Sequence, residues 1–257
     1  SSSSAASDVY KRQADERITA CLREAHRLNA VELSFLPLGA DRNTAVYRAG
    51  AEDGKRYFVK LRRGAFDEMS VTLPRFLADQ GIAQIIAPLP TKQGGLWTSL
   101  EAFRVIVYPF VEGRDGYEVG LSERQWAVFG AALKRIHTLA LPATLRGSIR
   151  QEDYSAEGRD SVVAFLHELE HARFDEPVAA RVAAFLRAKR ADVLDLVARA
   201  QRLAGVLRTR QPDLVLCHSD LHAGNIHVAG EGELYLVDWD EPILAPKERD
   251  LMYAGGG

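Results

Sequence analysis

The feature that most restricts the fold of this chain is a change in its hydrophobic pattern near residues 111–113. Before this point, short apolar stretches alternate with polar turns, which is typical of antiparallel strands. One of these turns is Asp53-Gly54, a dipeptide that favours a tight hairpin. Strands are expected at Val31–Leu38, Ala45–Ala49, Lys55–Leu61, Gln84–Pro88, Leu96–Leu100 and Phe103–Phe110, with helices at Ala14–Asn29 and Val71–Gln80.

After residue 113 the pattern becomes helical. Ser122 and Gln125 have the spacing of a capping box, in which a hydroxyl and a glutamine three residues later cap the first N–H groups of a helix. Further helices are expected at Ser161–Phe174 and Val178–Leu207, and short strands at Leu214–Cys217, Ile226–Val228 and Leu234–Val237. The pattern predicts an α+β fold with a β-rich lobe over residues 14–110 and a mainly helical lobe over residues 111–257.

Composition excludes several classes of protein. The formal net charge of −2 excludes a strongly basic nucleic-acid binder and an acidic disordered tail. Two cysteines are too few for a disulfide scaffold or a four-cysteine zinc site. No apolar stretch approaches the roughly eighteen residues that a membrane helix needs. We therefore expect a cytoplasmic globular protein, taken as a monomer, with no nucleic-acid or membrane partner.

The two ends of the chain differ in texture from the rest. Residues Ser3–Gln13 resemble the translation of an adapter used in transposase-based sequencing libraries, so residues 1–13 are expected to be a non-native or disordered leader. The other end closes on three glycines at 255–257 without a further helix or strand. We expect the helical lobe to be incomplete there.

The densest group of polar residues lies within residues 217–240. A Gly-rich turn predicts a hairpin, and folding the chain between residues 231 and 232 would place Asn225 opposite Asp238. An amide oxygen and a carboxylate in that position can share a hard cation such as Mg²⁺. Asp220 lies on the loop that leads into the hairpin. The alternative is that these residues only cap loops at strand ends, a common use of Asp and Asn.

The string His218-x-Asp220-x-x-x-x-Asn225, followed by Asp238, resembles the catalytic loop and metal-binding aspartate of kinase-like folds. In the form His-x-Asp-Leu-His-x-Gly-Asn with Asp-Trp-Asp, it is similar to the aminoglycoside phosphotransferase and choline kinase family, and residues 238–252 are similar to its spectinomycin branch. The resemblance covers about residues 35–257. It implies a two-lobed protein-kinase-like fold and an ATP- and Mg²⁺-dependent O-phosphotransferase. The implied acceptor is a hydroxyl of a small cationic molecule, an aminocyclitol or aminoglycoside antibiotic such as spectinomycin.

The resemblance also implies a role for each matching residue. Asp220 would accept or orient the proton of the attacking hydroxyl, and Asn225 and Asp238 would complete the catalytic group by holding Mg²⁺. Lys60, in a predicted strand, would bind the phosphates of ATP. The other implied contacts are Asn43 and Thr44 in a phosphate loop at Gly39–Thr44, the backbone of Tyr108 and Phe110 against adenine, and Asp240 and Glu241 facing a cationic acceptor. The alternative for Asp240 is that it braces the catalytic loop.

Several points stay open at this level. Glu68 is the candidate partner of Lys60, and a solvated surface role accounts for it equally well. Ser219 stands where the wider family has glycine, and His218 is expected to hold the loop by hydrogen bonds and not to carry protons. The alternative functions are another small-molecule kinase of this fold, for choline, a sugar or homoserine, and a truncated nucleotide-binding module with little turnover.

A separate pattern, His167-Glu168-Leu169-Glu170-His171, matches the H-E-x-x-H signature of zinc hydrolases. No third ligand follows at a recognised spacing, and charged residues flank the stretch. The pattern favours a solvated helix face over a zinc centre.

Overall fold

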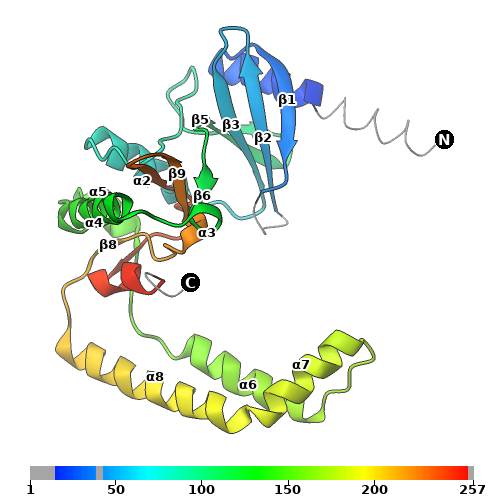
Figure 1. The fold of residues 1–257 in the computed structure, drawn as a ribbon, viewed down its shortest axis with the longest axis vertical. Helices are drawn as coiled ribbons and strands as arrows, with labels where there is room; N and C mark the ends of the chain where they lie inside the picture. Colours follow the sequence, from blue (N-terminus) through cyan, green and yellow to red (C-terminus); the bar gives the residue numbers. More distant parts are fainter. Residues whose placement is uncertain (1–14, 39–42, 254–257) are drawn as a thin grey trace. The chain divides into compact units, whose positions relative to one another are not determined.

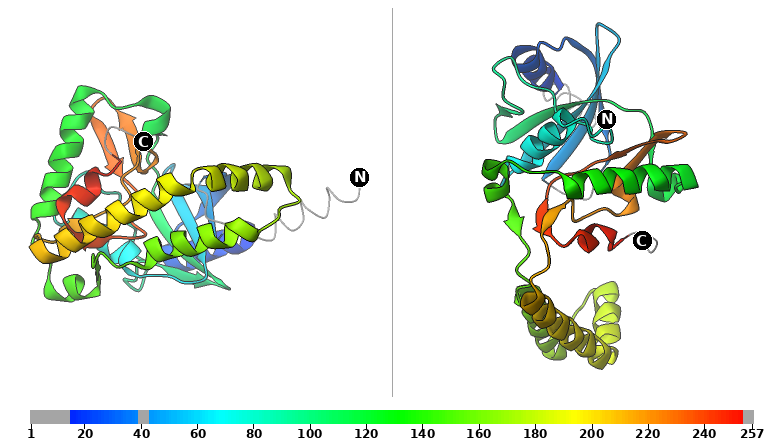
Figure 2. Two further views of the ribbon diagram at one scale, coloured as in Figure 1. Left: turned by 90° about the horizontal axis from the view of Figure 1, so that it is seen from below. Right: turned by 90° about the vertical axis from the view of Figure 1, so that its left-hand side faces the viewer.

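The computed structural model of the chain describes residues 15–38 and 43–253. The leader predicted at 1–13, residues 39–42 of the predicted phosphate loop and the glycines at 255–257 lie outside the described residues. The described part is a mixed α+β structure, as predicted (Figures 1 and 2). None of the helices in this part of the chain combines the length and the hydropathy of a membrane span.

The first half of the chain folds into a five-stranded antiparallel sheet with the order β1-β2-β3-β5-β4. The strands are β1 (Ala30–Leu36), β2 (Thr44–Ala51), β3 (Arg56–Arg63), β4 (Thr98–Leu100) and β5 (Phe103–Pro109), and α2 (Met69–Asp79) follows β3. The strands and the helix predicted in these regions are confirmed, each end within two residues of the prediction.

The alternation of side chains along β3, the middle strand, decides which way Lys60 points. Tyr57, Val59 and Leu61 are buried in a core that the helix of residues 15–26 covers. Successive side chains of a strand point to opposite faces, so Lys60 lies on the face away from that helix. Figure 1 shows the helix, in dark blue, against one side of the sheet.

The strand predicted at Gln84–Pro88 is wrong. This segment forms only an isolated bridge, between Ile85 and Leu236, within the described part of the chain. Pro88 lies at its end and has no N–H to donate, so a ladder cannot continue through this position.

The capping box predicted at the start of the next long helix is present. Ser122 Oγ accepts the N–H of Gln125 at 3.3 Å, and Gln125 Oε1 accepts the N–H of Ser122 at 2.9 Å. Gln125 Nε2 also donates to the carbonyl oxygen of Gly230 at 3.0 Å, which ties the helix to the following hairpin. The elements in this region are β6 (Arg114–Asp115), α3 (Gly116–Val119), α4 (Glu123–Thr138), α5 (Ala143–Ser148), β9 (Ile226–Gly230) and β10 (Glu233–Leu236).

The hairpin of β9 and β10 joins β6 in a three-stranded sheet, but its register differs from the prediction. The register shifts by one residue at the start of β10, and the N–H of Val237 donates to the carbonyl oxygen of Asn225 at 3.0 Å. Val237, and not Asp238, therefore lies opposite Asn225. A bulge of this kind adds one residue to one strand, and the hydrophobic pattern does not reveal it.

Three helices make up most of a second compact unit, which comprises residues 150–215 and 244–246. They are α6 (Glu157–His171), α7 (Pro177–Ala188) and α8 (Arg190–Arg210) (Figure 1). The single helix predicted at Val178–Leu207 is thus two helices, because Lys189 leaves the helical conformation with ψ at 8°. Arg187 Nε donates to the carbonyl oxygen of Leu169 at 2.9 Å, which holds α7 against α6.

The first compact unit contains the rest of the chain, residues 1–149, 216–243 and 247–257. The boundary predicted at residue 110 does not separate these units, because β6 pairs with β9 and the segment at Ile85 contacts β10. Every site residue predicted from the sequence belongs to this first unit. The remaining short elements are β7 (Arg150–Gln151), β8 (Val215–Cys217), the 3₁₀ turn η1 (Ala223–Asn225), β11 (Ile243–Ala245) and the 3₁₀ turn η2 (Lys247–Leu251).

Candidate active site

The loop between β8 and β9 brings Asp220 and Asn225 into contact. Asn225 is buried at the end of η1, and its Nδ2 donates to the carbonyl oxygen of Asp220 at 2.8 Å. The same nitrogen lies 3.4 Å from Asp220 Oδ2. Because the amide nitrogen is used within the loop, the amide oxygen of Asn225 is the atom that can meet a further group.

His218 connects this loop to the segment that carries Asp238. Its Nε2 lies 2.9 Å from the carbonyl oxygen of Val237, and its Nδ1 accepts the N–H of Asp220 at 3.4 Å. Burial lowers the pKa of His218, so the ring is neutral with its proton on Nε2. The indole of Trp239 packs against it, with ring centroids 4.4 Å apart. The predicted structural role of His218 fits these contacts.

The carboxylate of Asp250 holds the start of the same loop. Asp250 is buried, and its oxygens accept the N–H of Ser219 at 2.8 Å and the N–H of His218 at 3.2 Å. His137 Nε2, from α4, lies 2.8 Å from Asp250 Oδ2. The Asp250 side chain on η2 therefore holds the backbone of the two residues that precede Asp220.

We expect Asp250→Ala to lower the free energy of unfolding by about 3 kcal/mol, because two buried N–H groups and His137 would lose their acceptor. Urea titration of the variant and the parent protein measures this difference. Glu248→Ala, on the exposed side of the same 3₁₀ turn, is the control and should change stability by less than about 0.5 kcal/mol. Equal stability of the two variants would contradict the anchoring role.

Two non-glycine residues of the site adopt left-handed backbone conformations, Ser219 with φ of 74° and Asp238 with φ of 65°. Such residues cost free energy and persist where the surrounding contacts impose them, which is common at functional sites. Ser219 Oγ donates to the carbonyl oxygen of Glu241 at 2.8 Å, and this bond helps to hold the conformation. The glycine that the wider family has at position 219 would adopt this φ without strain.

Lys60, which is far from this loop in sequence, contacts the carboxylates of Asp238 and Asp240. Its Nζ lies 2.9 Å from Asp238 Oδ1 and 3.2 Å from Asp240 Oδ2. Arg62, two residues further along β3 and on the same face, contacts Asp240 Oδ2 at 2.7 Å. The Lys60 side chain is only 14% exposed, so this ion-pair group is largely withdrawn from solvent.

The protonation states in this group follow from burial and charge together. Burial lowers the pKa of Lys60, but the carboxylates of Asp238 and Asp240 outweigh it and hold the pKa above its ordinary value. Burial raises the pKa of Asp238, and the ammonium of Lys60 outweighs it, so that pKa lies below its usual range. For Asp240, burial and the neighbouring Asp238 prevail over the two cations and raise the pKa. The ammonium and the Asp238 carboxylate are therefore both charged at neutral pH.

The structure adds contacts that bear on two sequence-based assignments. The structure gives Lys60 the two aspartates as partners, and the described residues show no ion pair between Lys60 and Glu68. Asp240, expected to face a cationic acceptor, contacts Lys60 and Arg62, because both cations project from the same face of β3, and its role towards the acceptor stays a prediction. The side chain of Glu241 is exposed, and its expected role towards the acceptor stays a prediction.

The backbone at the end of β5 differs from the predicted adenine contacts. The N–H of Phe110 donates to the carbonyl oxygen of Arg56 at 3.0 Å, so the sheet already uses it. Tyr108, two residues before Phe110, lies opposite Phe58 of β3. Backbone groups alternate in direction along an antiparallel strand, so the N–H and C=O of Tyr108 point towards β3 as the N–H of Phe110 does. The carbonyl oxygen of Val107 faces away from β3 and accepts the N–H of Leu89 at 2.7 Å. By the same alternation, the carbonyl of Pro109 is the acceptor that points away from β3.

Only the end of the predicted phosphate loop belongs to the described residues. The N–H of Arg63 donates to the carbonyl oxygen of Asn43 at 2.8 Å, and Thr44 begins β2 opposite Arg62. The contacts expected from Asn43 and Thr44 to phosphate stay predictions.

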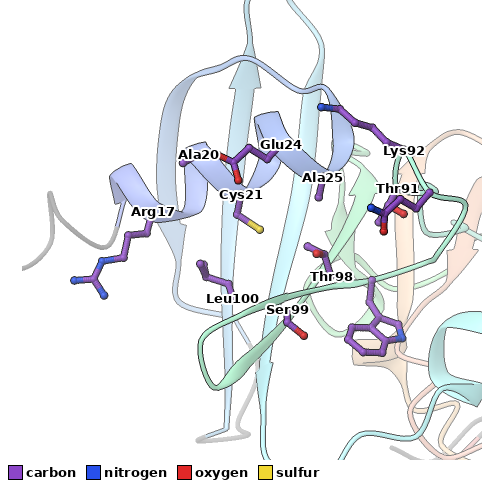
Figure 3. A pocket seen from close by; sticks show the side chains of 12 residues that line it. Arg17, Ala20, Cys21, Glu24, Ala25, Thr91, Lys92, Thr98, Ser99 and Leu100 are labelled. Atoms are coloured by element: carbon purple, nitrogen blue, oxygen red, sulfur yellow. The ribbon is translucent and has the colours of Figure 1, made fainter.

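A hollow of about 460 Å³ lies between the helix of residues 15–26 and the segment at 91–100 (Figure 3). Cys21 and Leu100 point towards it, and Arg17 stands at its edge. Burial, and then the charge of Glu24, raises the pKa of the Cys21 thiol, which is therefore protonated at neutral pH. No predicted site residue lines this hollow, because Lys60 lies on the other face of the sheet.

The histidine pattern on α6 is exposed, as predicted. Ligand atoms of His167, Glu170 and His171 come within 4.8 Å of one another. Glu170 is already paired with Arg190, 2.7 Å away, and the two histidine rings meet edge to face. A solvated helix face accounts for these contacts.

Comparison with known proteins decides the family. The model of the phosphotransferase enzyme family matches residues 34–254, most of the described chain. The chain belongs to this family. As a phosphotransferase family member it is a small-molecule kinase that transfers a phosphoryl group to an alcohol, and the predicted family and enzyme class are confirmed.

Proteins that are similar to this phosphotransferase support the same family and fold. Protein StrN of Streptomyces griseus is 26% identical over 232 residues, which are 85% of this chain and 67% of that protein. The structure of spectinomycin phosphotransferase APH(9)-Ia in complex with ADP and spectinomycin is 37% identical with a TM-score of 0.86, and the match covers 94% of this chain and 73% of that one. Choline kinase LicA of Streptococcus pneumoniae, 16% identical with a TM-score of 0.51 over 93% of this chain and 73% of that one, shares the fold alone. The predicted kinase-like fold is confirmed.

The donors of this phosphotransferase suit Mg²⁺, although the predicted register of the hairpin was wrong. Asn225 offers an amide oxygen, since its nitrogen donates to Asp220, and Asp238 offers a carboxylate oxygen beyond the one that meets Lys60. Both are hard oxygen ligands of the kind that Mg²⁺ prefers. The residues present therefore fit the metal that the family resemblance implied.

Sequence reasoning missed three residues that shape the phosphotransferase site. Arg62 could have been found, because its two-residue spacing from Lys60 places both on one strand face. His222 belongs to the His-x-Asp-Leu-His-x-Gly-Asn motif, but its stacking with Tyr117 arises from packing between α3 and η1, which no pattern in the sequence reports.

Proposed function

We propose that this chain is an ATP- and Mg²⁺-dependent O-phosphotransferase whose acceptor is a hydroxyl of an aminocyclitol or aminoglycoside, with spectinomycin as the leading candidate. The observation that carries the nucleotide part is the 2.9 Å contact of Lys60 with Asp238, residues 178 positions apart in the chain. A phosphate-binding cation and a metal-binding carboxylate meet there beside the loop that carries Asp220. The identity of 37% with a spectinomycin phosphotransferase supports the acceptor class.

The proposed roles follow from the contacts of each residue. Phosphoryl transfer needs little covalent help from the protein, so positioning and charge neutralisation supply most of the rate. The ammonium of Lys60 would bind phosphate oxygens, and Mg²⁺ held by Asn225 and Asp238 would neutralise the charge that develops on them. Asp220 would receive the proton of the acceptor hydroxyl. The carbonyl of Pro109 at the end of β5 would accept a hydrogen bond from adenine.

The test incubates the purified chain with ATP, Mg²⁺ and spectinomycin and follows the mass of the acceptor. We expect spectinomycin to gain the mass of one phosphoryl group in the presence of Mg²⁺ and none with excess EDTA. A parallel panel contains other aminoglycosides, choline, homoserine and a simple sugar. Transfer to choline or a sugar alone would overturn the proposed acceptor class.

A thermal-shift titration with ATP and Mg²⁺ runs beside this assay, because a ligand that binds only the folded chain raises its melting temperature. Stabilisation without transfer to any acceptor would support the alternative of a nucleotide-binding module. Neither stabilisation nor transfer would overturn the nucleotide site itself.

A further inference from the structure

His222, two residues after Asp220, has a single neutral tautomer that fits its contacts. It is the N-cap of η1, and its Nδ1 accepts the N–H of Gly224 at 3.0 Å. A ring nitrogen that accepts a hydrogen bond carries no proton, so the proton of His222 is assigned to Nε2. The other ring nitrogen is thus a donor.

That donor faces the carboxylate of Asp220. His222 Nε2 lies 3.7 Å from Asp220 Oδ2, the same oxygen that Asn225 Nδ2 approaches at 3.4 Å. Both distances are long for hydrogen bonds, as catalytic contacts often are before the substrates bind. Both donors therefore lie on the Oδ2 side of this carboxylate.

Aromatic rings fix the position of the imidazole. The ring of Tyr117 stacks on it with centroids 5.8 Å apart and planes 19° apart, and Tyr253 meets it edge on at 6.0 Å. Tyr117 is held in turn by the N-cap of α3, since its N–H donates to Asp115 Oδ1 at 2.9 Å. The His222 side chain remains 32% exposed, which leaves this group beside Asp220 open to a small acceptor.

Glycine at position 224 makes this stack possible. A Cβ added there would lie 2.9 Å from Cε1 of His222 and 3.2 Å from a ring carbon of Tyr117. The first distance is shorter than real Cβ contacts, so a side chain at 224 would displace the imidazole. Gly116 allows α3 to lie close to η1, because a Cβ there would lie 2.9 Å from the carbonyl oxygen of Ala223.

We propose that His222 is a positioning residue that orients the Asp220 carboxylate through Oδ2, so that Oδ1 receives the proton of the acceptor hydroxyl. The inference rests on the proposed phosphotransferase function and deepens it. In the step, the acceptor O–H proton passes to Oδ1, the acceptor oxygen forms its bond to the γ-phosphorus, and the bond from that phosphorus to ADP breaks. His222 keeps its own proton throughout.

Two substitutions distinguish the roles of the two ring nitrogens of His222. His222→Asn keeps a short acceptor for the Gly224 N–H and loses the donor towards Asp220, while His222→Gln can reach Asp220 with its amide and loses the short cap. We expect His222→Asn to lower kcat by about 10- to 100-fold, with KM for ATP within about twofold, because small misplacements of a catalytic group have effects of this size. His222→Gln should recover at least several-fold of that loss in kcat although its stability is lower.

Gly224→Ala provides a variant that removes no functional group. We expect it to lower kcat in the same range, because the added methyl displaces the imidazole, and to leave KM for ATP unchanged. Gly230→Ala, where an added Cβ meets nothing within 4 Å, is the matched control and should retain the parent kcat. A purely structural His222 would instead give full kcat in His222→Asn and a loss in His222→Gln, and that outcome would overturn the proposal.

A second measurement does not depend on turnover. ¹⁵N NMR of the histidine side chains, assigned with His222→Asn, should show His222 as the neutral Nε2–H tautomer at pH 7.5, with a shift of that nitrogen in Asp220→Ala. A proton on Nδ1, or no response to Asp220→Ala, would overturn the positioning role even if no acceptor is found. The absence of transfer by the parent protein to every acceptor, with the expected NMR result, would overturn the proposed function alone.

Discussion

Asp220→Asn should lower kcat of phosphoryl transfer by about 10²- to 10⁴-fold, the range that general-base catalysis commonly contributes. The donors on Asn225 and His222 both face Oδ2 of the carboxylate. An asparagine at position 220 would therefore turn its oxygen towards them and present its NH₂ group to the acceptor hydroxyl. A proton acceptor would become a donor at the reacting position. Initial rates at saturating ATP and acceptor measure the loss.

ATP binding should survive this substitution. Lys60 and Asp238 contact each other without Asp220, and the 2.8 Å bond from Asn225 goes to the backbone carbonyl at position 220, which the variant keeps. We expect KM for ATP within about twofold of the parent value. Asp213→Asn, an exposed loop aspartate shortly before β8, is the control and should behave as the parent protein does. Full activity of Asp220→Asn would refute the assignment of the proton acceptor.

Local patterns predicted the parts of the fold that local chemistry decides. The turn at Asp53-Gly54 and the apolar residues after it predicted a strand at Lys55–Leu61, and β3 forms there; the period of two along this strand then puts Lys60 on one face. Ser122 and Gln125 predicted the start of α4, because a capping box is complete within four residues. The loop residues Asp220 and Asn225 came from a spacing that the family shares, and the structure brings them into contact.

Other features depend on backbone geometry that residue types alone do not specify. The bulge at the start of β10 moved Asp238 out of register with Asn225. Positive φ at Ser219 and Asp238 has no signal in the residue types, since tertiary contacts impose it. Lys189 is a fair helix former, so the sequence did not predict that the helix ends there and separates α7 from α8.

The partners of Lys60 were the least predictable part of the site. Glu68 lies close in sequence, whereas Asp238 and Asp240 lie about 180 positions away and reach Lys60 only when the loop after β10 has folded. Long-range ion pairs of this kind follow from tertiary structure, and no pattern within one segment reports them. The contacts of Asp240 with Lys60 and Arg62 are of the same kind, and the family resemblance alone did not predict them.

The second large effect is expected at Lys60 itself. Lys60→Met keeps the length of the side chain and removes the ammonium that contacts Asp238 and Asp240. Without it, the phosphates of ATP would lose a cation in a largely desolvated position, where such charges have their greatest effect on the transition state. We expect kcat/KM for ATP to fall by about 10²- to 10³-fold, and the stabilisation by ATP and Mg²⁺ in a thermal-shift titration to fall with it.

The hairpin that carries Lys60 provides its own control. Lys55 lies at the turn with its side chain 71% exposed, and within the described part of the chain its ion pair is with Asp53 on the surface, so Lys55→Met should retain kcat/KM within about twofold. Arg62→Leu tests the second cation on this face of β3 separately, because Arg62 contacts Asp240 whereas Lys60 contacts Asp238. If Arg62→Leu abolished turnover while Lys60→Met retained it, the phosphate-binding role would belong to Arg62, and Lys60 would serve only to pair the two aspartates.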